Sequence, residues 1–447
     1  MGRNRALWML WGGEFASRVG ESFFQITLLW YLVETSGSTL EVGLATMFAY
    51  LPALVVGIGA GVWVDRWDYR HVMLGSNALR GLAALAIPLL YVLGSLPVWL
   101  LAALAFLVAS FSAFFNPARD ATIPLLAGPG DLLAANSLVQ TAWQFSLLVG
   151  PFLAALALPW MPTISLFVLV SLAFWASLAV LIPLPRVTRA RVGPAEARVV
   201  QEDGAPGLSA AVVGGATAPH VPFMPYGKGT PGFLAEFRAG LGFLMGERRV
   251  FWLWVIAAVN NFFLMGPVIV GMPIYVKEHL GGTGSDFALI EGTYAGGMIV
   301  STWLVSRFAK RWNPARLMFW ALIYDGLTFV PMLWITSVPA TVALIAVHSL
   351  GIPAITVTRL TALQRIVRPE VRGRIFSYFH LAVSGMTALS IGAVGWVLAW
   401  LPVNGLFAAI GLCSAATGVA ALLLPHFQGA EAEGLLTGAS AAADASV

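Results

Sequence analysis

Apolar runs of roughly twenty residues recur along the whole chain and limit its fold more than any other feature. A helix of that length spans the hydrocarbon core of a bilayer and satisfies its backbone hydrogen bonds internally. Only 10% of the residues are charged, whereas soluble domains have about 25%. The sequence therefore predicts an all-α membrane protein with about twelve transmembrane helices. The runs lie at approximately 6 to 33, 39 to 64, 71 to 94, 97 to 117, 136 to 160, 162 to 185, 250 to 276, 286 to 308, 314 to 337, 339 to 359, 372 to 400 and 402 to 425.

The longest polar segment separates six runs from another six. Its first part is rich in Arg, Pro, Gly and Ala, which is typical of a flexible linker, and the apolar stripe from Phe233 to Leu244 predicts an amphipathic surface helix. The segment from Ser306 to Arg311 repeats the arginine spacing found from Asp65 to Arg70, so we expect two pseudo-symmetric halves. The predicted organisation is a six-helix half at 1 to 185, a cytoplasmic linker with an amphipathic helix at 186 to 249, a second six-helix half at 250 to 425 and a flexible cytoplasmic tail at 426 to 447.

Basic residues predict the topology. They gather on one side of the twelve-span arrangement, Arg119 among them, and only Lys277 falls in a loop on the other side. Because cytoplasmic loops carry the excess of Lys and Arg, we expect both termini and the linker in the cytoplasm. The first apolar run is too long for a cleavable signal peptide. The predicted location is the cell membrane, with the chain crossing it many times.

The sequence offers little for cofactor chemistry. It has no Walker loop, no cluster with metal-ligand spacing and no nucleophile constellation. The single cysteine, Cys413, supports neither a disulfide nor a metal site and is interpreted as a packing residue. We therefore expect no metal, no cofactor, no enzymatic activity and no nucleic-acid partner.

A charged loop follows the second run and is a candidate conformational latch. Gly61 permits close helix approach, and Asp65 can pair with Arg66 or Arg70 or lie near a helix N-terminus. The start of the eleventh run, which carries Arg372 and Arg374, is the helix terminus expected to hold Asp65. Alternatively, the loop arginines only set the topology.

The first run carries a polar stripe. Glu14, Arg18, Glu21 and Gln25 recur at helical spacing and share one face, which predicts a polar cavity wall. The alternative is a self-neutralising ladder that stabilises packing. Arg18 is expected to approach only one of its two acidic neighbours, and the carboxylate left without it to carry a proton. We favour Glu21, which lies deeper in the span.

Polar residues in later runs extend this pattern. Arg80 requires an acidic partner on another helix because an unpaired guanidinium is costly in a membrane. Gly150 and Pro151 are expected to interrupt and bend the fifth run. Asp325 is the alternative proton carrier or a partner for Arg80, and His348 is a cavity residue or a packing residue. Three further cavity candidates share one helix face, and their alternative role is interhelical hydrogen bonding: Asn136, Gln140 and Gln144. The remaining candidates are Asn260, Asn261 and Glu291, and Glu291 can instead lie near the outer surface.

Several of these motifs match known transporters. The spacing Gly-x-x-x-Asp-Arg-x-x-x-Arg from 61 to 70 resembles the loop signature of the major facilitator superfamily, with His71 where a second basic residue is common. Five further segments resemble its drug:proton antiporter branch, which includes macrolide efflux proteins and the enterobactin exporter. They are 17 to 21 (SRVGE), 116 to 119 (NPAR), 135 to 140 (ANSLVQ) with Gly150-Pro151, and 369 to 374 (PEVRGR). The sequence departs from the branch at Glu14, which replaces an uncharged polar residue, at Glu21, which replaces a frequent Asp, and in the fourth run, which lacks the Arg of other drug antiporters.

The resemblance implies the major facilitator fold and a secondary transporter that exports its substrate at the expense of the proton gradient, and we expect a monomer. The polar and aromatic cavity fits a small amphipathic substrate, which can be cationic. One alternative is export of a siderophore or another anionic metabolite anchored by Arg18 and Arg80. A remote alternative is a polytopic membrane enzyme or receptor, which would need a catalytic cluster or a folded soluble domain. The expected partners are the substrate, protons and the bilayer.

Overall fold

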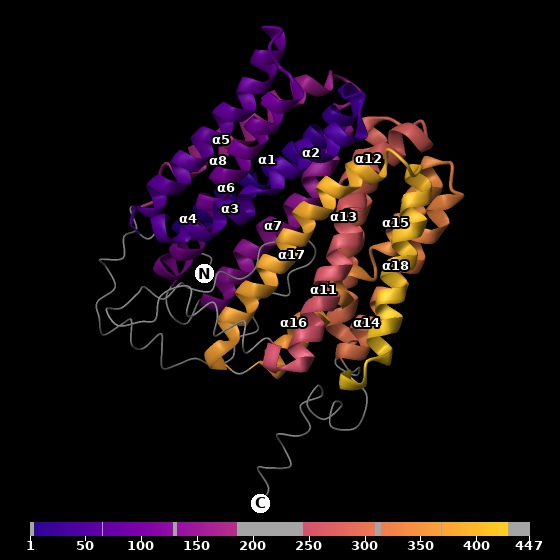
Figure 1. The fold of residues 1–447 in the computed structure, drawn as a ribbon. Coiled ribbons are helices and arrows are strands. Elements are labelled where there is room, and N and C mark those ends of the chain that lie inside the picture. The colour runs from indigo at the N-terminus through magenta and orange to yellow at the C-terminus, as the bar shows by residue number, and fades with distance from the viewer. Residues whose placement is uncertain are drawn as a thin grey trace, which may run out of the picture. The chain divides into compact units, whose positions relative to one another are not determined.

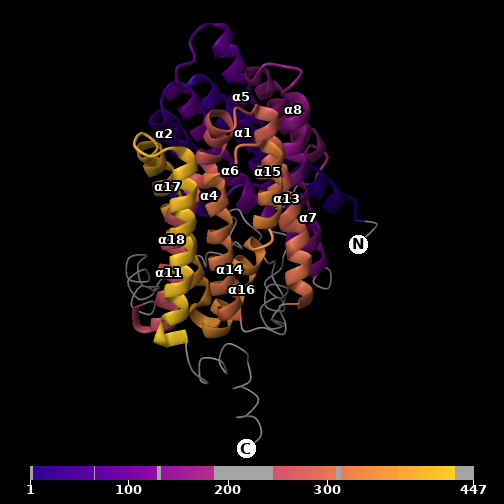
Figure 2. The ribbon, with the colours of Figure 1, turned by 90° about the vertical axis from the view of Figure 1, so that its right-hand side faces the viewer.

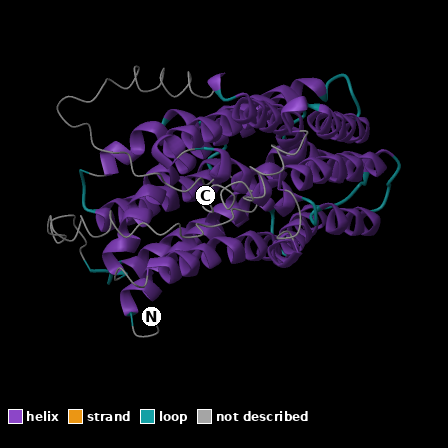
Figure 3. Ribbon diagram, turned by 90° about the horizontal axis from the view of Figure 1, so that it is seen from below, coloured by secondary structure: helices purple, strands orange, loops and turns teal. Residues whose placement is uncertain are grey.

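The computed structural model describes residues 4–64, 66–127, 132–185, 245–308, 314–367 and 369–427. These residues form helices joined by short loops, so the predicted all-α class is confirmed (Figure 3). The amphipathic helix predicted between 233 and 244, most of the linker and the tail beyond 427 lie outside the described residues. The chain divides into two compact units: unit 1 is Met1–Ala210 with Gly281–Gly292, and unit 2 is Ala211–Leu280 with Thr293–Val447.

Nine segments of the described residues are long and apolar enough to cross a membrane. They are Tyr69–Val92, Val98–Leu126, Ala135–Ala157, Thr163–Leu181, Arg248–His279, Arg316–Leu333, Val338–Leu363, Phe379–Val397 and Val403–Leu423. The 31-residue helix α1 (Arg5–Thr35) is not among them, and it carries the polar stripe.

Unit 1 is a helical bundle built around α1 (Figure 1). Helix α1 packs on α7 and α8, while α5 packs on α6 and α8. Small residues allow these close contacts, because a Cβ at Gly13 would meet Leu181 and a Cβ at Gly81 would meet Trp175. The other long helices of this bundle are α5 (Tyr69–Val92), α6 (Val98–Leu126), α7 (Leu132–Ala157) and α8 (Thr163–Leu181).

Two expectations for unit 1 are wrong in detail. The second run is not one continuous helix but three pieces, α2 (Thr39–Tyr50), α3 (Pro52–Val55) and α4 (Gly57–Val64). Pro52 lacks a backbone N–H, which removes one hydrogen bond at the first of these breaks, and it occupies the first position of α3. The fourth run was expected to end near 117, but α6 continues to Leu126 and carries residues 118 to 126 inside the helix.

Unit 2 contains a second bundle, in which α14 packs on α16 and α18, and α11 packs on α17 (Figure 2). A Cβ at Gly411 of α18 would lie 2.5 Å from the Gly326 carbonyl oxygen of α14, so only glycine permits this approach. The elements of this bundle are α11 (Arg248–Gly266), η3 (Pro267–Gly271), α12 (Met272–Ile274), η4 (Tyr275–His279), α13 (Gly284–Phe308, whose first turns belong to unit 1), α14 (Pro314–Phe329), η6 (Val330–Leu333), α15 (Val338–His348), α16 (Ile352–Ile366), α17 (Pro369–Val397), α18 (Val403–Leu423) and η7 (Pro425–Phe427).

Helix α11 ends where a side chain from another helix enters its hydrogen-bond ladder. The Gly266 N–H donates to Ser390 Oγ over 2.7 Å, and the same hydroxyl donates to the Phe262 carbonyl oxygen. The next residue is Pro267, which has no N–H to donate. A hydroxyl from α17 therefore replaces one rung of α11 immediately before the π-helical turn η3.

Candidate functional site

Unit 1 holds a buried group of ionisable side chains, the charge cluster, at the centre of its bundle. Its members come from α1, which carries the polar stripe, and from α5 and α6, whose arginines reach that stripe. The cluster consists of Glu14, Arg18, Glu21, Arg80, Arg119 and Asp120.

Glu14 is fully buried and accepts from two guanidinium groups through one oxygen. Arg18 Nε lies 2.8 Å from Glu14 Oε1, and Arg119 reaches the same oxygen from α6. The other oxygen, Oε2, is buried without a hydrogen-bond partner among the described residues. Two cations within contact distance compensate the charge of this carboxylate.

Both carboxylate oxygens of Glu21 accept hydrogen bonds, unlike those of Glu14. Its Oε2 accepts from Arg18 Nη1 at 2.9 Å, and its Oε1 accepts from Arg80 Nη1 and Ser112 Oγ, both at 2.6 Å. The expectation that Arg18 approaches only one acidic neighbour is therefore wrong. The side chain is long enough to place Nε on one carboxylate and Nη1 on the other, because the acids lie four residues before it and three residues after it.

Arg80 has the acidic partner that its position required, and this partner is Glu21 and not Asp325. The guanidinium is fully buried, donates to Ser17 Oγ at 2.8 Å and to Asn77 Oδ1, and lies 4.7 Å from the centre of the Phe174 ring. A polar and aromatic shell thus holds this cation in place.

A hydrogen-bond chain fixes that shell to the backbone. Asn77 Nδ2 donates to Ser177 Oγ at 2.7 Å, and Ser177 Oγ donates to the Gly13 carbonyl oxygen at 2.6 Å. Three helices are joined in this way, so Asn77 presents its oxygen to Arg80 in a fixed orientation.

Arg119 is one of two cluster members that the sequence did not predict, and the other is its neighbour Asp120. Arg119 was counted with the cytoplasmic charges, but it lies inside α6, is 8% exposed and pairs with Glu14 and with Asp120 Oδ1 (2.7 Å). On the same helix, Asn116 Oδ1 accepts from Arg18 Nη2 at 2.7 Å. The signal was available in the segment Asn116-Pro-Ala-Arg119, whose end residues are three apart and therefore share a helix face.

The charge cluster is formally neutral. Three guanidinium groups, on Arg18, Arg80 and Arg119, face three carboxylates, on Glu14, Glu21 and Asp120. Each carboxylate contacts at least one guanidinium, so the net negative stripe expected from α1 alone is compensated by α5 and α6.

The remaining polar candidates of unit 1 do not join the cluster. Gln25 and Asn136 are exposed, Gln144 is half-buried, and Gln140 has a buried Nε2 without a partner among the described residues. Helix α7 runs through Gly150 and Pro151, so these residues do not interrupt the helix. A Cβ at Gly150 would lie 2.6 Å from the Ser22 Cβ, which identifies this position as a close contact between α1 and α7.

Unit 2 contains a smaller polar group around Asp325 of α14. Asp325 and His348 are buried, and Asp325 Oδ1 lies 3.6 Å from His348 Nε2. The other imidazole nitrogen, Nδ1, lies 2.8 Å from Thr328 Oγ1, and the ring packs 4.3 Å from the ring of Phe329. The structure therefore places Asp325 and His348, which the sequence treated separately, in one pair.

The other polar candidates near this pair have different partners. Asn260 Oδ1 accepts from Ser414 Oγ at 2.8 Å, and Asn261 Nδ2 donates to Thr387 Oγ1 at 2.6 Å. Both asparagines therefore join α11 to neighbouring helices. Glu291 is half-buried in the first part of α13, which belongs to unit 1.

The predicted latch is only partly described. Asp65 lies outside the described residues, as do the surroundings of Gly61 and the side chains of Arg372 and Arg374. The contact between Asp65 and these arginines therefore stays a prediction. Arg66 is exposed and lies 6.0 Å from the centre of the Trp63 ring.

Arg70 has a contact that the sequence did not predict. Its Nη2 donates to the carbonyl oxygen of Ile182, the residue that follows α8. A cation at a helix C-terminus compensates the unpaired carbonyl groups there.

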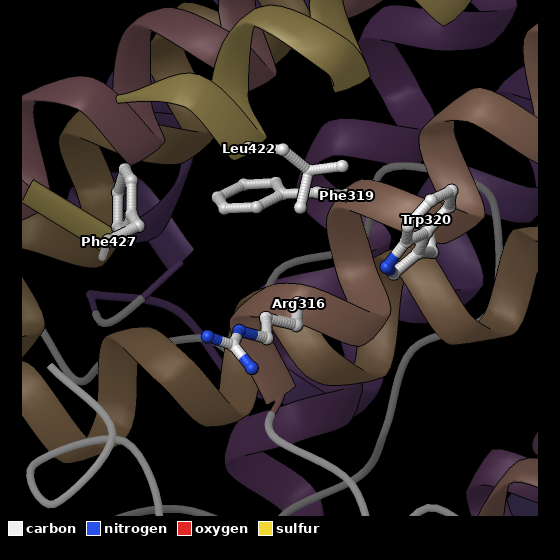
Figure 4. A pocket seen from close by; sticks show the side chains of 5 residues that line it. All are labelled: Arg316, Phe319, Trp320, Leu422 and Phe427. Atoms are coloured by element: carbon white, nitrogen blue, oxygen red, sulfur yellow. The ribbon is translucent and has the colours of Figure 1, made fainter. Parts of the chain in front are cut away.

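A surface hollow of about 490 Å³ lies in unit 2 (Figure 4). Phe319 and Phe427 meet edge to face in its wall, 5.1 Å apart, and Arg316 is its charged residue. Arg316 precedes Asp325 by nine residues, roughly 13 Å along α14. Asp325, His348 and Thr328 are not among the residues that line the hollow. Its remaining lining residues are Trp320 and Leu422.

Comparisons with known proteins place these features in a family. The sequence matches the model of the Major Facilitator Superfamily over residues 10–389 and 255–435. It is 24% identical over 401 residues to macrolide efflux protein A of Streptococcus pyogenes, which covers 87% of this chain and 91% of the relative. It is 23% identical over 416 residues to the multidrug efflux pump Tap of Mycobacterium tuberculosis, which covers 91% of this chain and 90% of the relative.

A solved structure shares the fold. It is a bacterial homologue of the human lysosomal transporter Spinster in an inward-facing and unoccupied conformation, with a TM-score of 0.66 and 15% identity. The match covers 99% of this chain and 98% of that chain. The similarity extends over both units and rests on fold, since the sequence identity is low.

Proposed function

Because this chain belongs to the major facilitator superfamily, we propose that it is a secondary active transporter that exports small amphipathic molecules by proton-coupled alternating access. The observation that carries the proposal is the similarity to macrolide and multidrug efflux proteins along about nine-tenths of the chain, 87% for one relative and 91% for the other. The proposal includes twelve helices in two six-helix halves, both termini in the cytoplasm and a monomeric protein in the cell membrane.

The charge cluster supports an amphipathic or cationic substrate over an anionic one. Arg18 and Arg80, the anchors that an anion would need, are already paired with Glu14 and Glu21. A bound anion would have to separate these buried pairs, and removing one partner of a buried pair costs about 3–5 kcal/mol. Of the two acids on α1, Glu21 has the more exposed side chain, 19% against 0% for Glu14, and is therefore better placed to meet a cationic substrate.

The proton carrier is proposed from the same contacts. Glu14 and Glu21 each contact two guanidinium groups, which stabilise the ionised form of both acids. Asp325 contacts no guanidinium or ammonium group among the described residues, and both of its oxygens are unsatisfied. We therefore place Asp325 ahead of Glu21 as the coupling acid, with Glu14 third.

The test is a substrate panel in inverted vesicles with an imposed pH gradient, followed by reconstitution of Asp325→Asn and Glu21→Gln in liposomes. A coupling variant loses gradient-driven uphill transport and keeps substrate-for-substrate exchange, because exchange needs no net proton cycle. We expect this result for Asp325→Asn. If Asp325→Asn concentrates substrate at the wild-type rate, Asp325 is not the carrier. If no panel member responds to the gradient in the wild type, proton-coupled export itself is refuted.

The latch is tested separately. We propose that Asp65 stabilises one conformation and does not bind substrate. Asp65→Asn should slow turnover while equilibrium substrate affinity stays within a few-fold of wild type. Strongly weakened binding at unchanged turnover would contradict this role.

A further inference from the structure

The Asp325 carboxyl group is buried in unit 2 without a donor. Its exposure is 0%, and neither Oδ1 nor Oδ2 has a hydrogen-bond partner among the described residues. The nearby Ser414 hydroxyl donates to Asn260 Oδ1 instead. An ionised carboxylate in such surroundings is very costly, whereas the neutral acid is tolerated. The observed arrangement therefore fits a carboxyl group that carries a proton.

Hydrogen-bond accounting places that proton. The Thr328 hydroxyl has one hydrogen, and it lies 2.7 Å from the Asp325 carbonyl oxygen and 2.8 Å from His348 Nδ1. When the hydroxyl donates to the carbonyl oxygen, it must accept a hydrogen from Nδ1. His348 Nε2 then faces Asp325 Oδ1 at 3.6 Å, and two lone pairs would repel there unless a proton lies between them.

The alternative orientation of the hydroxyl describes the site after loss of one proton. If Thr328 donates to Nδ1, the neutral imidazole carries its hydrogen on Nε2 and directs it at the Asp325 carboxylate. The pair then has a net charge of −1, and a slight approach of the ring completes one hydrogen bond to the charged oxygen. The site thus has a defined geometry for both protonation states.

The ionisable groups on the surrounding elements leave His348 as the partner of Asp325. Tyr294 of α13 stacks on the His348 ring at 6.1 Å, and the hydroxyl of Tyr324, on the same helix as Asp325, donates to the Val347 carbonyl oxygen. Among the described residues, only His348 lies within ion-pair distance of Asp325. Among the described side chains, α16 and α18, which pack on α14, carry two further ionisable groups, Arg359 and Cys413.

From this geometry we propose that Asp325, His348 and Thr328 form a proton-binding site that takes up and releases one proton. In the loaded state the proton lies between Oδ1 and Nε2, and Nδ1–H donates to the hydroxyl. On release, Nδ1 gives its proton to water, the bridging proton stays on Nε2, and the hydroxyl turns from the carbonyl oxygen to Nδ1. Thr328 is a positioning residue, because it acts on the proton through the imidazole.

The site also explains how proton binding can follow a conformational change. Asp325 and His348 have side chains only 0% and 3% exposed, so exchange with water requires movement of the helices around them. A site that equilibrates with water only after such a movement couples protonation to conformation. This coupling role rests on the proposed function, whereas proton binding itself does not.

The test measures protonation directly, in the purified full-length protein in lipid nanodiscs. Infrared difference spectra against Asp325→Asn should show one carboxylic-acid band that disappears as the pH rises. In His348→Phe the band should persist to a pH higher by at least about one unit, a tenfold change in proton affinity, because the ionised carboxylate has lost the imidazole that faces Oδ1. Thr417→Val is the matched control, since that hydroxyl only bonds the Cys413 carbonyl oxygen of its own helix, and it should leave the band unchanged.

Thr328 is tested by nitrogen NMR with 15N-labelled histidine, assigned with His348→Gln. Wild-type His348 should change from Nδ1–H to Nε2–H across the same pH range, and Thr328→Val should abolish this fixed tautomer change while the protein stays folded. Wild-type spectra identical to those of Asp325→Asn, or a His348 signal independent of pH, would overturn the proposal. A site that titrates in a protein that shows no gradient-driven transport would instead refute the proposed function and leave the site intact. If Asp325→Asn does not fold, the wild-type NMR titration decides alone.

Discussion

The pair formed by Arg80 and Glu21 predicts a large coupling energy within unit 1. Arg80→Met removes a fully buried guanidinium whose Nη1 lies 2.6 Å from Glu21 Oε1. Loss of one partner of a buried pair costs about 3–5 kcal/mol. Because Glu21 keeps Arg18 at 2.9 Å and Ser112 at 2.6 Å, we expect the lower end, about 3 kcal/mol. That value reduces the folding equilibrium constant by roughly two orders of magnitude.

The double variant separates the pair from its surroundings. Glu21→Gln leaves the Arg80 cation with neutral acceptors and should cost about 3 kcal/mol by the same reasoning. In the double variant no charge is left unpaired at this contact, so it should cost about 2 kcal/mol less than the sum of the single changes. Such non-additivity is the signature of direct coupling between the two side chains.

The measurement is reversible unfolding by sodium dodecyl sulfate in bicelles, followed by tryptophan fluorescence. Arg66→Met is the control, because the Arg66 side chain is exposed and its guanidinium lies 6.0 Å from the centre of the Trp63 ring; it should cost less than about 1 kcal/mol. Additivity of the two cluster variants within about 0.5 kcal/mol would refute the coupling and, with it, the idea that the cluster acts as one unit.

Two further predictions concern helix contacts in unit 2. Gly411→Ala should destabilise the protein by about 2–3 kcal/mol, because the added Cβ would lie 2.5 Å from the Gly326 carbonyl oxygen, and a backbone atom cannot move aside cheaply. Ser390→Ala should cost about 1–3 kcal/mol, because it leaves the Gly266 N–H and the Phe262 carbonyl oxygen without the bridging hydroxyl. Both changes are measured by the same unfolding assay.

Matched variants control these two predictions. Gly405→Ala lies on the same helix as Gly411, and its Cβ would meet Leu401 at an ordinary 3.5 Å, so it should be neutral or slightly stabilising. Thr417→Val removes a hydroxyl that bonds only its own helix and should change stability little. Equal changes in the free energy of unfolding for Gly411→Ala and Gly405→Ala would show that α14 and α18 separate easily. Unchanged stability of Ser390→Ala would show that the hydrogen bonds of α11 do not need the hydroxyl.

The helices were largely predictable because each membrane helix corresponds to a long apolar run in the sequence. The predicted runs that begin near 97 and 162 start within two residues of helices α6 (Val98–Leu126) and α8 (Thr163–Leu181). Hydropathy failed where charge entered a helix or proline interrupted one. Helix α6 continues past Pro117 and carries Arg119, while the second run breaks near Pro52 into three pieces.

The candidate site was predictable only within one helix. Spacing placed Glu14, Arg18 and Glu21 on one face because helical periodicity is local. Which cations would reach those acids from other helices depends on packing, and the positive-inside rule assigned Arg119 to the cytoplasmic surface. The pairing of Asp325 with His348 was equally out of reach, since the two residues lie on different helices and no local spacing joins them.

The two polar groups differ in the way their charge is balanced, and this difference argues for a division of roles. In unit 1 each acid contacts guanidinium groups, which cannot be deprotonated in proteins, so the group holds its charge at every working pH. In unit 2 the partner of Asp325 is an imidazole, which, unlike a guanidinium, can give up a proton. A group balanced by fixed charges suits a scaffold or a contact for a cationic substrate, whereas a group balanced by a mobile proton suits coupling. We therefore propose that unit 1 supplies the stable electrostatic frame and that unit 2 supplies the proton switch.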